Sequence, residues 1–181
     1  MKATGIVRRI DDLGRVVVPK EIRRTLRIRE GDPIEIFTNR EGEIILKKYS
    51  RIGEMTEFAK SYAEAVAQTL GHIVVIADTD QIVAVSGAAK KEWLQKPLSR
   101  EFESTLYNRE TVVATKEEQG FVPISEDISD VSSEVIVPIV SEGDAIGAFL
   151  ILSREAKVRL GETETKVASA AASFLGKQME G

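Results

Sequence analysis

The chain has 181 residues, of which 43% are hydrophobic, and a formal net charge of −4. No run approaches the ~18 unbroken apolar residues of a membrane span, and the N-terminal residues lack the apolar core of a signal peptide. Cysteine is absent, which excludes disulfides, thiolate metal sites and cysteine nucleophiles. We therefore expect a cytoplasmic protein with no membrane association, and we favour two small globular domains over one large one.

Charge is distributed unevenly along the chain. Residues 1–29 contain nine Lys/Arg and three acidic residues, a net charge of +6, whereas residues 51–181 have a net charge of −8. A phosphate backbone would repel the acidic part, so any contact with a polyanion should be confined to the basic N-terminal part.

Residues 1–50 show the pattern of two β-hairpins around a short helix. Turn residues at Asp11–Gly14 and Asn39–Gly42 separate the paired runs. A helix follows Pro19, with Ile22 and Leu26 on one face, and it ends before Gly31. The Ile- and Val-rich runs that predict strands are 5–10, 15–18, 34–37 and 43–48.

A unit of this size buries little apolar surface by itself. Domains this small usually need disulfides, a metal or a partner chain, and this chain has no cysteine. We therefore infer an obligate dimer in which strands from two chains complete a shared core.

Residues 55–70 predict an amphipathic helix, because apolar side chains recur three and four positions apart. Two strands and short helices should follow up to residue 107, and a final helix should span about 162–179. The remaining predicted strands are 111–115, 121–124, 134–140 and 145–153. This order indicates an α+β sandwich with a mostly antiparallel sheet and flanking helices. The apolar stripes of the two long helices could cover their own sheet or form a bundle between subunits.

The sequence offers no catalytic constellation, so we do not expect an enzyme. A single histidine, His72, opens an apolar strand and is expected to be structural. Asp78 and Asp80 begin like a calcium loop, but Gln81-Ile82-Val83 follows them, so a turn is favoured. We expect no metal and no cofactor. A turn is also favoured for Ser86–Ala88, while the role of Trp93 stays open.

The arginines near the N-terminus are the residues that indicate chemistry. A guanidinium group can grip a phosphate or pair with guanine in the major groove, and a two-stranded ribbon fits that groove. Arg8, Arg9 and Arg15 should cluster near the tip of the first hairpin, with Arg23 and Arg24 nearby. DNA contact is favoured over a solvated basic face, while RNA and acidic proteins stay open as partners.

The runs Gly5–Arg8 and Leu13–Arg23 resemble the AbrB group of bacterial transition-state regulators. The rest of the chain, around Leu70–Ile76 and Ala84–Gly87, resembles members that add a C-terminal GAF-type domain. The resemblance implies a swapped-hairpin dimer at the N-terminus and a GAF-like sandwich behind it. It also implies that Arg8, Arg15, Arg23 and Arg24 contact DNA, with Arg9 and Lys20 as neighbouring candidates. The full DNA-binding set is then Arg8, Arg9, Arg15, Lys20, Arg23 and Arg24.

The expected organisation is a swapped-hairpin DNA-binding domain at 1–50, a linker at 51–55 and a GAF-like domain at 56–181. The resemblance implies a nucleoid-associated activator and repressor of late sporulation genes, which binds double-stranded DNA as a homotetramer. A small-molecule effector of the GAF-like domain is part of this expectation, but no ligand-binding residue can be assigned. The alternative is an antitoxin-type interaction module that regulates its own promoter.

Overall fold

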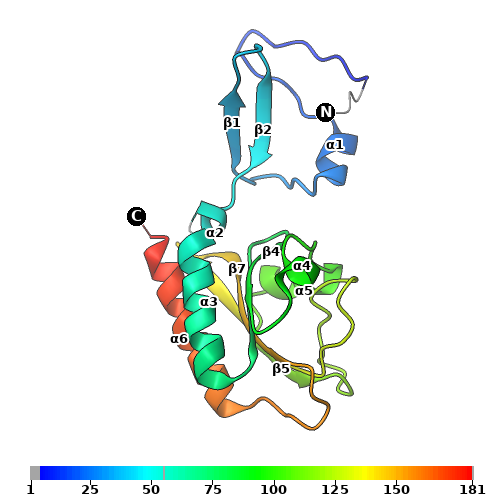
Figure 1. Ribbon diagram of the computed structural model, residues 1–181. Helices are drawn as coiled ribbons and strands as arrows, with labels where there is room; N and C mark the ends of the chain where they lie inside the picture. The colour runs from blue at the N-terminus through cyan, green and yellow to red at the C-terminus, as the bar shows by residue number, and fades with distance from the viewer. Residues whose placement is uncertain (1–4, 55, 181) are drawn as a thin grey trace. The chain divides into compact units, whose positions relative to one another are not determined.

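A computed structural model describes residues 5–54 and 56–180. It contains two compact units that divide between Tyr49 and Ser50, termed here the N-terminal and C-terminal domains (Figure 1). No helix within the described ranges is both long and apolar enough to cross a bilayer.

In residues 5–49 the N-terminal domain forms one helix and one hairpin: α1 (Lys20–Thr25), β1 (Ile34–Thr38) and β2 (Ile44–Lys48). The strands pair antiparallel from Ile34 opposite Lys48 to Thr38 opposite Ile44. Their turn is held by the Asn39 side chain, whose Oδ1 accepts from the backbone N–H groups of Glu41 and Glu43. The predicted helix and second hairpin are confirmed.

The predicted first hairpin is wrong for the single chain, since residues 5–10 and 15–18 form no strands. Figure 1 shows this part of the trace running out to a turn and back without joining a sheet. Val7 and Val17 are 90% and 68% exposed, so the two segments have no apolar surface to pack against. An isolated two-stranded hairpin is marginal in water, which explains why the turn forms without its ladder.

The predicted linker at 51–55 is also wrong over its described part. Residues Arg51–Glu54 form a short helix, α2, whose Ile52 is 1% exposed and belongs to the core around Phe149. Arg51 Nη1 lies 3.0 Å from Glu142 Oε2, so an ion pair also fastens α2 to the C-terminal domain. The segment was predicted as a linker because it is mostly polar, but its apolar residue Ile52 packs into the core.

The C-terminal domain is built on a five-stranded sheet with the order β4-β3-β7-β6-β5. Every neighbouring pair in the sheet is antiparallel. The strands are β3 (Ile73–Ala77), β4 (Ile82–Ser86), β5 (Val112–Thr115), β6 (Ser133–Ser141) and β7 (Asp144–Ser153). The strand predicted at 121–124 is wrong, because Pro123 cannot donate to a ladder and Ile124 packs over the sheet instead of within it.

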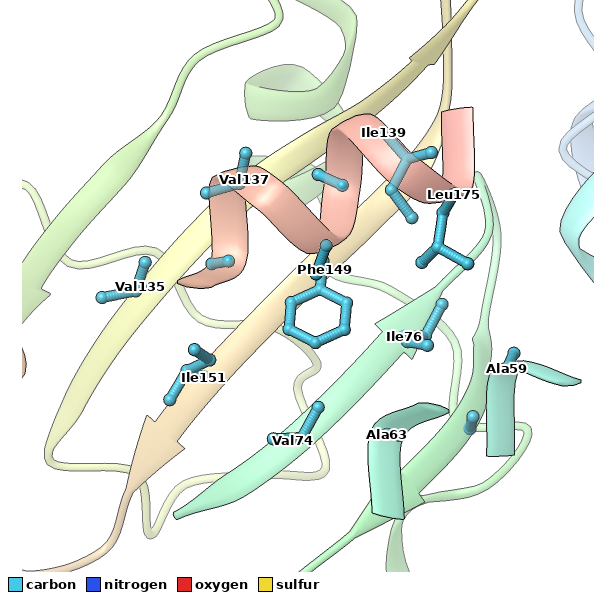
Figure 2. Packing of buried hydrophobic residues seen from close by; sticks show 14 of the residues in the cluster. Ala59, Ala63, Val74, Ile76, Val135, Val137, Ile139, Phe149, Ile151 and Leu175 are labelled. Carbon is cyan, nitrogen blue, oxygen red and sulfur yellow. The ribbon is translucent and has the colours of Figure 1, made fainter. Parts of the chain in front are cut away.

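One face of the sheet is covered by the long helices α3 (Thr56–Leu70) and α6 (Glu162–Gln178). Small residues of both helices, Ala63 and Ala171 among them, pack on Val74, Ile76 and Phe149. Figure 2 shows Phe149 pointing from β7 into this layer, between strand β3 and helix α6. The helices thus cover their own sheet.

The other face carries the short helices α4 (Lys90–Trp93) and α5 (Arg100–Tyr107) together with the segment 116–132. Ile73 and Val75 point to this face, as expected when successive strand residues alternate. Trp93 is 1% exposed and packs here, which settles its role as a core residue. Two apolar layers therefore enclose the sheet.

Candidate nucleic-acid interface

The turn at Asp11–Arg15 positions the side chain of Arg15. Asp11 Oδ1 accepts from the backbone N–H groups of Leu13 (3.0 Å) and Arg15 (2.8 Å), and Gly14 takes a φ of 75°. The hydrogen bond from the Arg15 backbone is the main reason that the pKa of Asp11 lies below its ordinary value. Arg15 Nε lies 2.9 Å from Asp11 Oδ2, while 70% of its side chain stays exposed. The turn orients Arg15 and leaves it open to a partner.

Helix α1 places three further basic side chains on one face, because Lys20, Arg23 and Arg24 are three and four positions apart. All three are exposed. Arg23 and Arg24 lie in the last helical turn, where the helix dipole favours cations. Pro19 directly precedes the helix as its N-cap residue and is itself buried.

Arg8 and Arg9 lie in the irregular segment before the turn, and both are exposed. The structure thus keeps the whole predicted set on the surface of one domain. It groups Lys20, Arg23 and Arg24 on one helix and sets Arg15 at the turn. Whether Arg8 and Arg9 join Arg15 stays a prediction, because the paired strands that would align them do not form in the single chain.

The same domain exposes an unusual amount of apolar surface. Among residues 5–49, Pro19 is the one residue that is buried. Large side chains exposed by more than half include Val7, Ile10, Leu13, Val17, Leu26, Ile36 and Ile44. Exposed apolar groups in such number mark a surface that another molecule covers.

The other motifs singled out in the sequence have structural roles. Asp78 Oδ1 accepts from the N–H groups of Asp80 and Gln81, both at 2.8 Å, which makes it a turn residue. Burial raises its pKa. Gly87 takes a φ of 81° in a turn, as expected for its segment. No group of three or more metal-ligating side chains comes together within the described residues.

One functional candidate was missed in the sequence. Glu134 is fully buried at the start of β6, where we expected only a strand end. The available signal was a single charge directly before the apolar run 135–140, because that run fits a buried strand.

Comparison with known proteins identifies the chain. Residues 54–180 match the family model described as stage V sporulation protein T C-terminal, transcription factor. Across 99% of its length the chain is 54% identical to stage V sporulation protein T of Bacillus subtilis (strain 168), of which it covers 99%. The chain belongs to the stage V sporulation protein T family. As a member of this family it is a transcription regulator.

The N-terminal domain of this family member is of the AbrB type. It is 63% identical over 49 residues to the transition state regulatory protein AbrB of Bacillus subtilis (strain 168), which is 27% of this chain and 50% of AbrB. Residues 7–54 also match the model described as antidote-toxin recognition MazE, bacterial antitoxin. The resemblance found in the sequence is confirmed.

The C-terminal domain has the GAF fold. The GAF domain of the Acinetobacter phosphoenolpyruvate-protein phosphotransferase superposes with a TM-score of 0.56 at 14% identity, over 74% of this chain and 84% of that one. At this identity the likeness concerns the fold alone. The predicted α+β sandwich with an antiparallel sheet is confirmed.

Proposed function

We propose that the chain regulates transcription by binding double-stranded DNA through Arg8, Arg9, Arg15, Lys20, Arg23 and Arg24 of an intertwined N-terminal dimer. The observation that carries the proposal is the exposure of this entire basic set on one domain. Guanidinium groups bind phosphates and guanine edges with paired hydrogen bonds, so a surface rich in arginine suits DNA.

The exposed apolar side chains support the dimer. Val7, Val17 and Ile36 are each more than 65% exposed in one chain, although all three occur in strand-forming runs. A second copy would supply the missing strands for residues 5–10 and 15–18 and cover these side chains. The dimer would then present two equivalent arginine sets on one surface.

The C-terminal domain would join two such dimers into a homotetramer. Phe58 of α3 and Phe174 of α6 are 37% and 41% exposed, and their rings lie 5.9 Å apart. Tyr62 stacks on both rings. Partly exposed aromatic clusters are typical of interface centres, so we place the contact between dimers on these two helices.

In this account the protein activates some late sporulation genes and represses others, and it works on the nucleoid in the cytoplasm. The GAF-like domain senses a small-molecule effector, and the chain performs no catalysis. Sequence identity to a sporulation protein over the whole chain supports the biological setting.

The proposal is tested by measuring DNA affinity with variants of the basic set. Arg15→Ala and Arg23→Ala should each weaken binding by at least about tenfold, since each removes two contacts per dimer. Arg40→Ala is the matched control, because Arg40 is exposed in the same domain but lies at the β1–β2 turn. Equal affinity of Arg15→Ala, Arg23→Ala and Arg40→Ala would contradict the assignment.

An antitoxin-type module is the second candidate, favoured by the match of residues 7–54 to an antitoxin model. The folded core of the C-terminal domain argues against it, because antitoxin tails that bind toxins are typically short. Co-purification of a small protein in fixed stoichiometry with the chain from its native host would favour this candidate.

A further inference from the structure

Glu134 is a buried carboxyl group on the sheet face that α5 and the segment 116–132 cover. It pairs with Ala114 of β5 and Leu152 of β7 in the middle of a three-strand stretch, and its side chain has no exposed surface. Oε1 accepts from the backbone N–H of Val122 at 2.6 Å. Oε2 has no hydrogen-bond partner among the described residues. One oxygen of the carboxyl group is therefore unused.

A cavity of about 200 Å³ adjoins this carboxyl group. Most of its wall is apolar and comes from the segment that folds over the sheet, including Phe121, Ile124, Ile128 and Val131. At about 30 Å³ per water the cavity has room for about seven water-sized groups, fewer than a drug-sized ligand needs. Its occupant must be small.

Glu134 favours a cationic occupant over an anionic one. Lys116 and Glu126 also line the cavity, and their opposite charges offset each other. The Lys116 ammonium donates to the Ser129 carbonyl at 2.6 Å, which holds it at the wall of the cavity. An anion would place negative charge against Glu134, whereas a cation would compensate it.

With protein groups alone around it, Glu134 has a cost in either protonation state. Burial raises its pKa to about 8, from an ordinary value of 4.5. The protonated group keeps an unpaired O–H donor, and the ionised group keeps an unpaired charge. A primary ammonium ion would remove both costs, because it ionises the carboxyl group and donates to Oε2 in a charge-assisted hydrogen bond.

We propose that Glu134 anchors a binding site for a small primary ammonium compound with a short apolar body, inside the C-terminal domain. Oε2 is itself buried, so binding requires a small shift of the covering segment that opens this oxygen to the cavity. The ammonium group then bonds Oε2, and the apolar body lies against Phe121, Ile128 and their neighbours. This inference rests on the sensory part of the proposed function and gives the effector a chemical class. The site is independent of the arginines that would contact DNA.

The test uses the full chain with methylammonium, n-butylammonium and benzylammonium chlorides, whose sizes bracket the cavity. Sodium chloride at equal ionic strength and benzyl alcohol are the controls for charge screening and for the apolar body. At least one ammonium ion should raise the melting temperature at about pH 8, following the linkage between binding and stability. The neutral alcohol should raise it much less.

Two variants test whether ammonium binding depends on the carboxyl group of Glu134. Glu134→Gln keeps the acceptor for Val122 but loses the charge, so ammonium affinity should fall at least about tenfold. Glu110→Gln removes an exposed carboxyl group of the same domain that does not line the cavity, and it should retain binding. Equal affinity of the wild type and Glu134→Gln overturns the proposal, as does the absence of binding by all three ammonium ions.

A measurement on the wild type alone guards against a variant that folds poorly. Binding must expel the proton of Glu134, so ammonium affinity should rise about tenfold per pH unit up to about pH 8 and then level off. A flat dependence over this range contradicts the assignment. DNA affinity measured on the same samples separates the two proposals: failed ammonium binding with intact DNA binding refutes only the sensory site.

Discussion

The two domains of this chain differ in how far each covers its own apolar side chains. In the C-terminal domain Val74, Ile76 and Phe149 have no exposed surface, because helices or a folded segment cover both faces of the sheet. In the N-terminal domain Val7, Ile10 and Val17 are each more than 65% exposed. Both domains consist of Ile- and Val-rich runs, so composition does not explain the difference.

Size and layering explain it. Over residues 5–49 the N-terminal domain has a single two-stranded sheet and a six-residue helix, and such a unit has no second layer to pack on. The C-terminal domain places layers on both faces of five strands. A domain that cannot complete its own layers is expected to recruit a second copy, and under the proposed function that copy would supply a second set of DNA-binding arginines.

The largest expected effect is a loss of stability in the C-terminal domain, which covers its own apolar side chains. Phe149→Ala removes a ring that is fully buried against β3 and the long helices. The free energy of unfolding of the C-terminal domain should fall by about 4 kcal/mol, as for other buried phenylalanines. Denaturant unfolding followed by circular dichroism measures the change. A loss below about 1 kcal/mol would show that this core is not closed.

Val17→Asp tests the other side of the comparison. In the single chain Val17 is 68% exposed, and a surface substitution there should change stability by less than about 0.5 kcal/mol. In the proposed dimer the charge would be buried, and the dimer should weaken by about 3 kcal/mol. Sedimentation equilibrium measures the association. Val113→Asp, on the edge strand β5 and 46% exposed, is the control and should leave association unchanged.

Gly147→Ala sharpens the claim that β7 is tightly enclosed. A Cβ atom at this position would lie 2.1 Å from the Ala77 carbonyl oxygen and 2.5 Å from Ile52 Cδ1. Backbone must shift, so unfolding should become easier by about 2 to 3 kcal/mol. Gly120→Ala is the control, because a Cβ atom there meets nothing within 4 Å. Equal melting temperatures of the two variants would show that the sheet yields at Gly147.

The smallest expected effect is the change in the free energy of unfolding for each unit of pH. The pKa of Glu134 is raised from 4.5 to about 8 by burial, so between these values the folded state holds a proton that the unfolded state releases. Stability should therefore fall by about 1.4 kcal/mol per pH unit as pH rises from 5 to 7. Glu134→Gln should lack this slope. Burial also raises the pKa of Asp78, which contributes equally to both proteins and cancels in their difference. Parallel stability curves for the wild type and Glu134→Gln would mean that Glu134 ionises normally.

Elements whose partners lie close in the same chain could be predicted from the sequence. Helices α3 and α6 have long apolar stripes, and the β1–β2 turn has Asn39 in the position that holds it. The first hairpin could not be predicted correctly for one chain, because its apolar face has no partner there. Residues 121–124 were misassigned because an apolar run that covers a sheet has the same composition as a strand within it.

The two candidate sites also differ in how far they could be predicted from the sequence. The basic set near the N-terminus is visible as charge, and exposure of those side chains follows from their hydration. The charge before the apolar run 135–140 was visible in the sequence, but the burial of Glu134 depends on how the segment 116–132 folds back over the sheet. A carboxylate at a strand end is ordinarily solvated, so this site needed the structure.

The salt dependence of DNA binding tests the central claim most directly. If a tetramer neutralises on the order of eight phosphates, the logarithm of affinity should fall with the logarithm of salt concentration at a slope of about −7. Arg15→Ala should make the slope shallower by about 2 for each bound dimer, because the dimer loses two phosphate contacts, while Arg40→Ala should leave it unchanged. A wild-type slope near zero, or identical slopes for all three proteins, would contradict DNA binding through the paired arginine sets of the N-terminal domain.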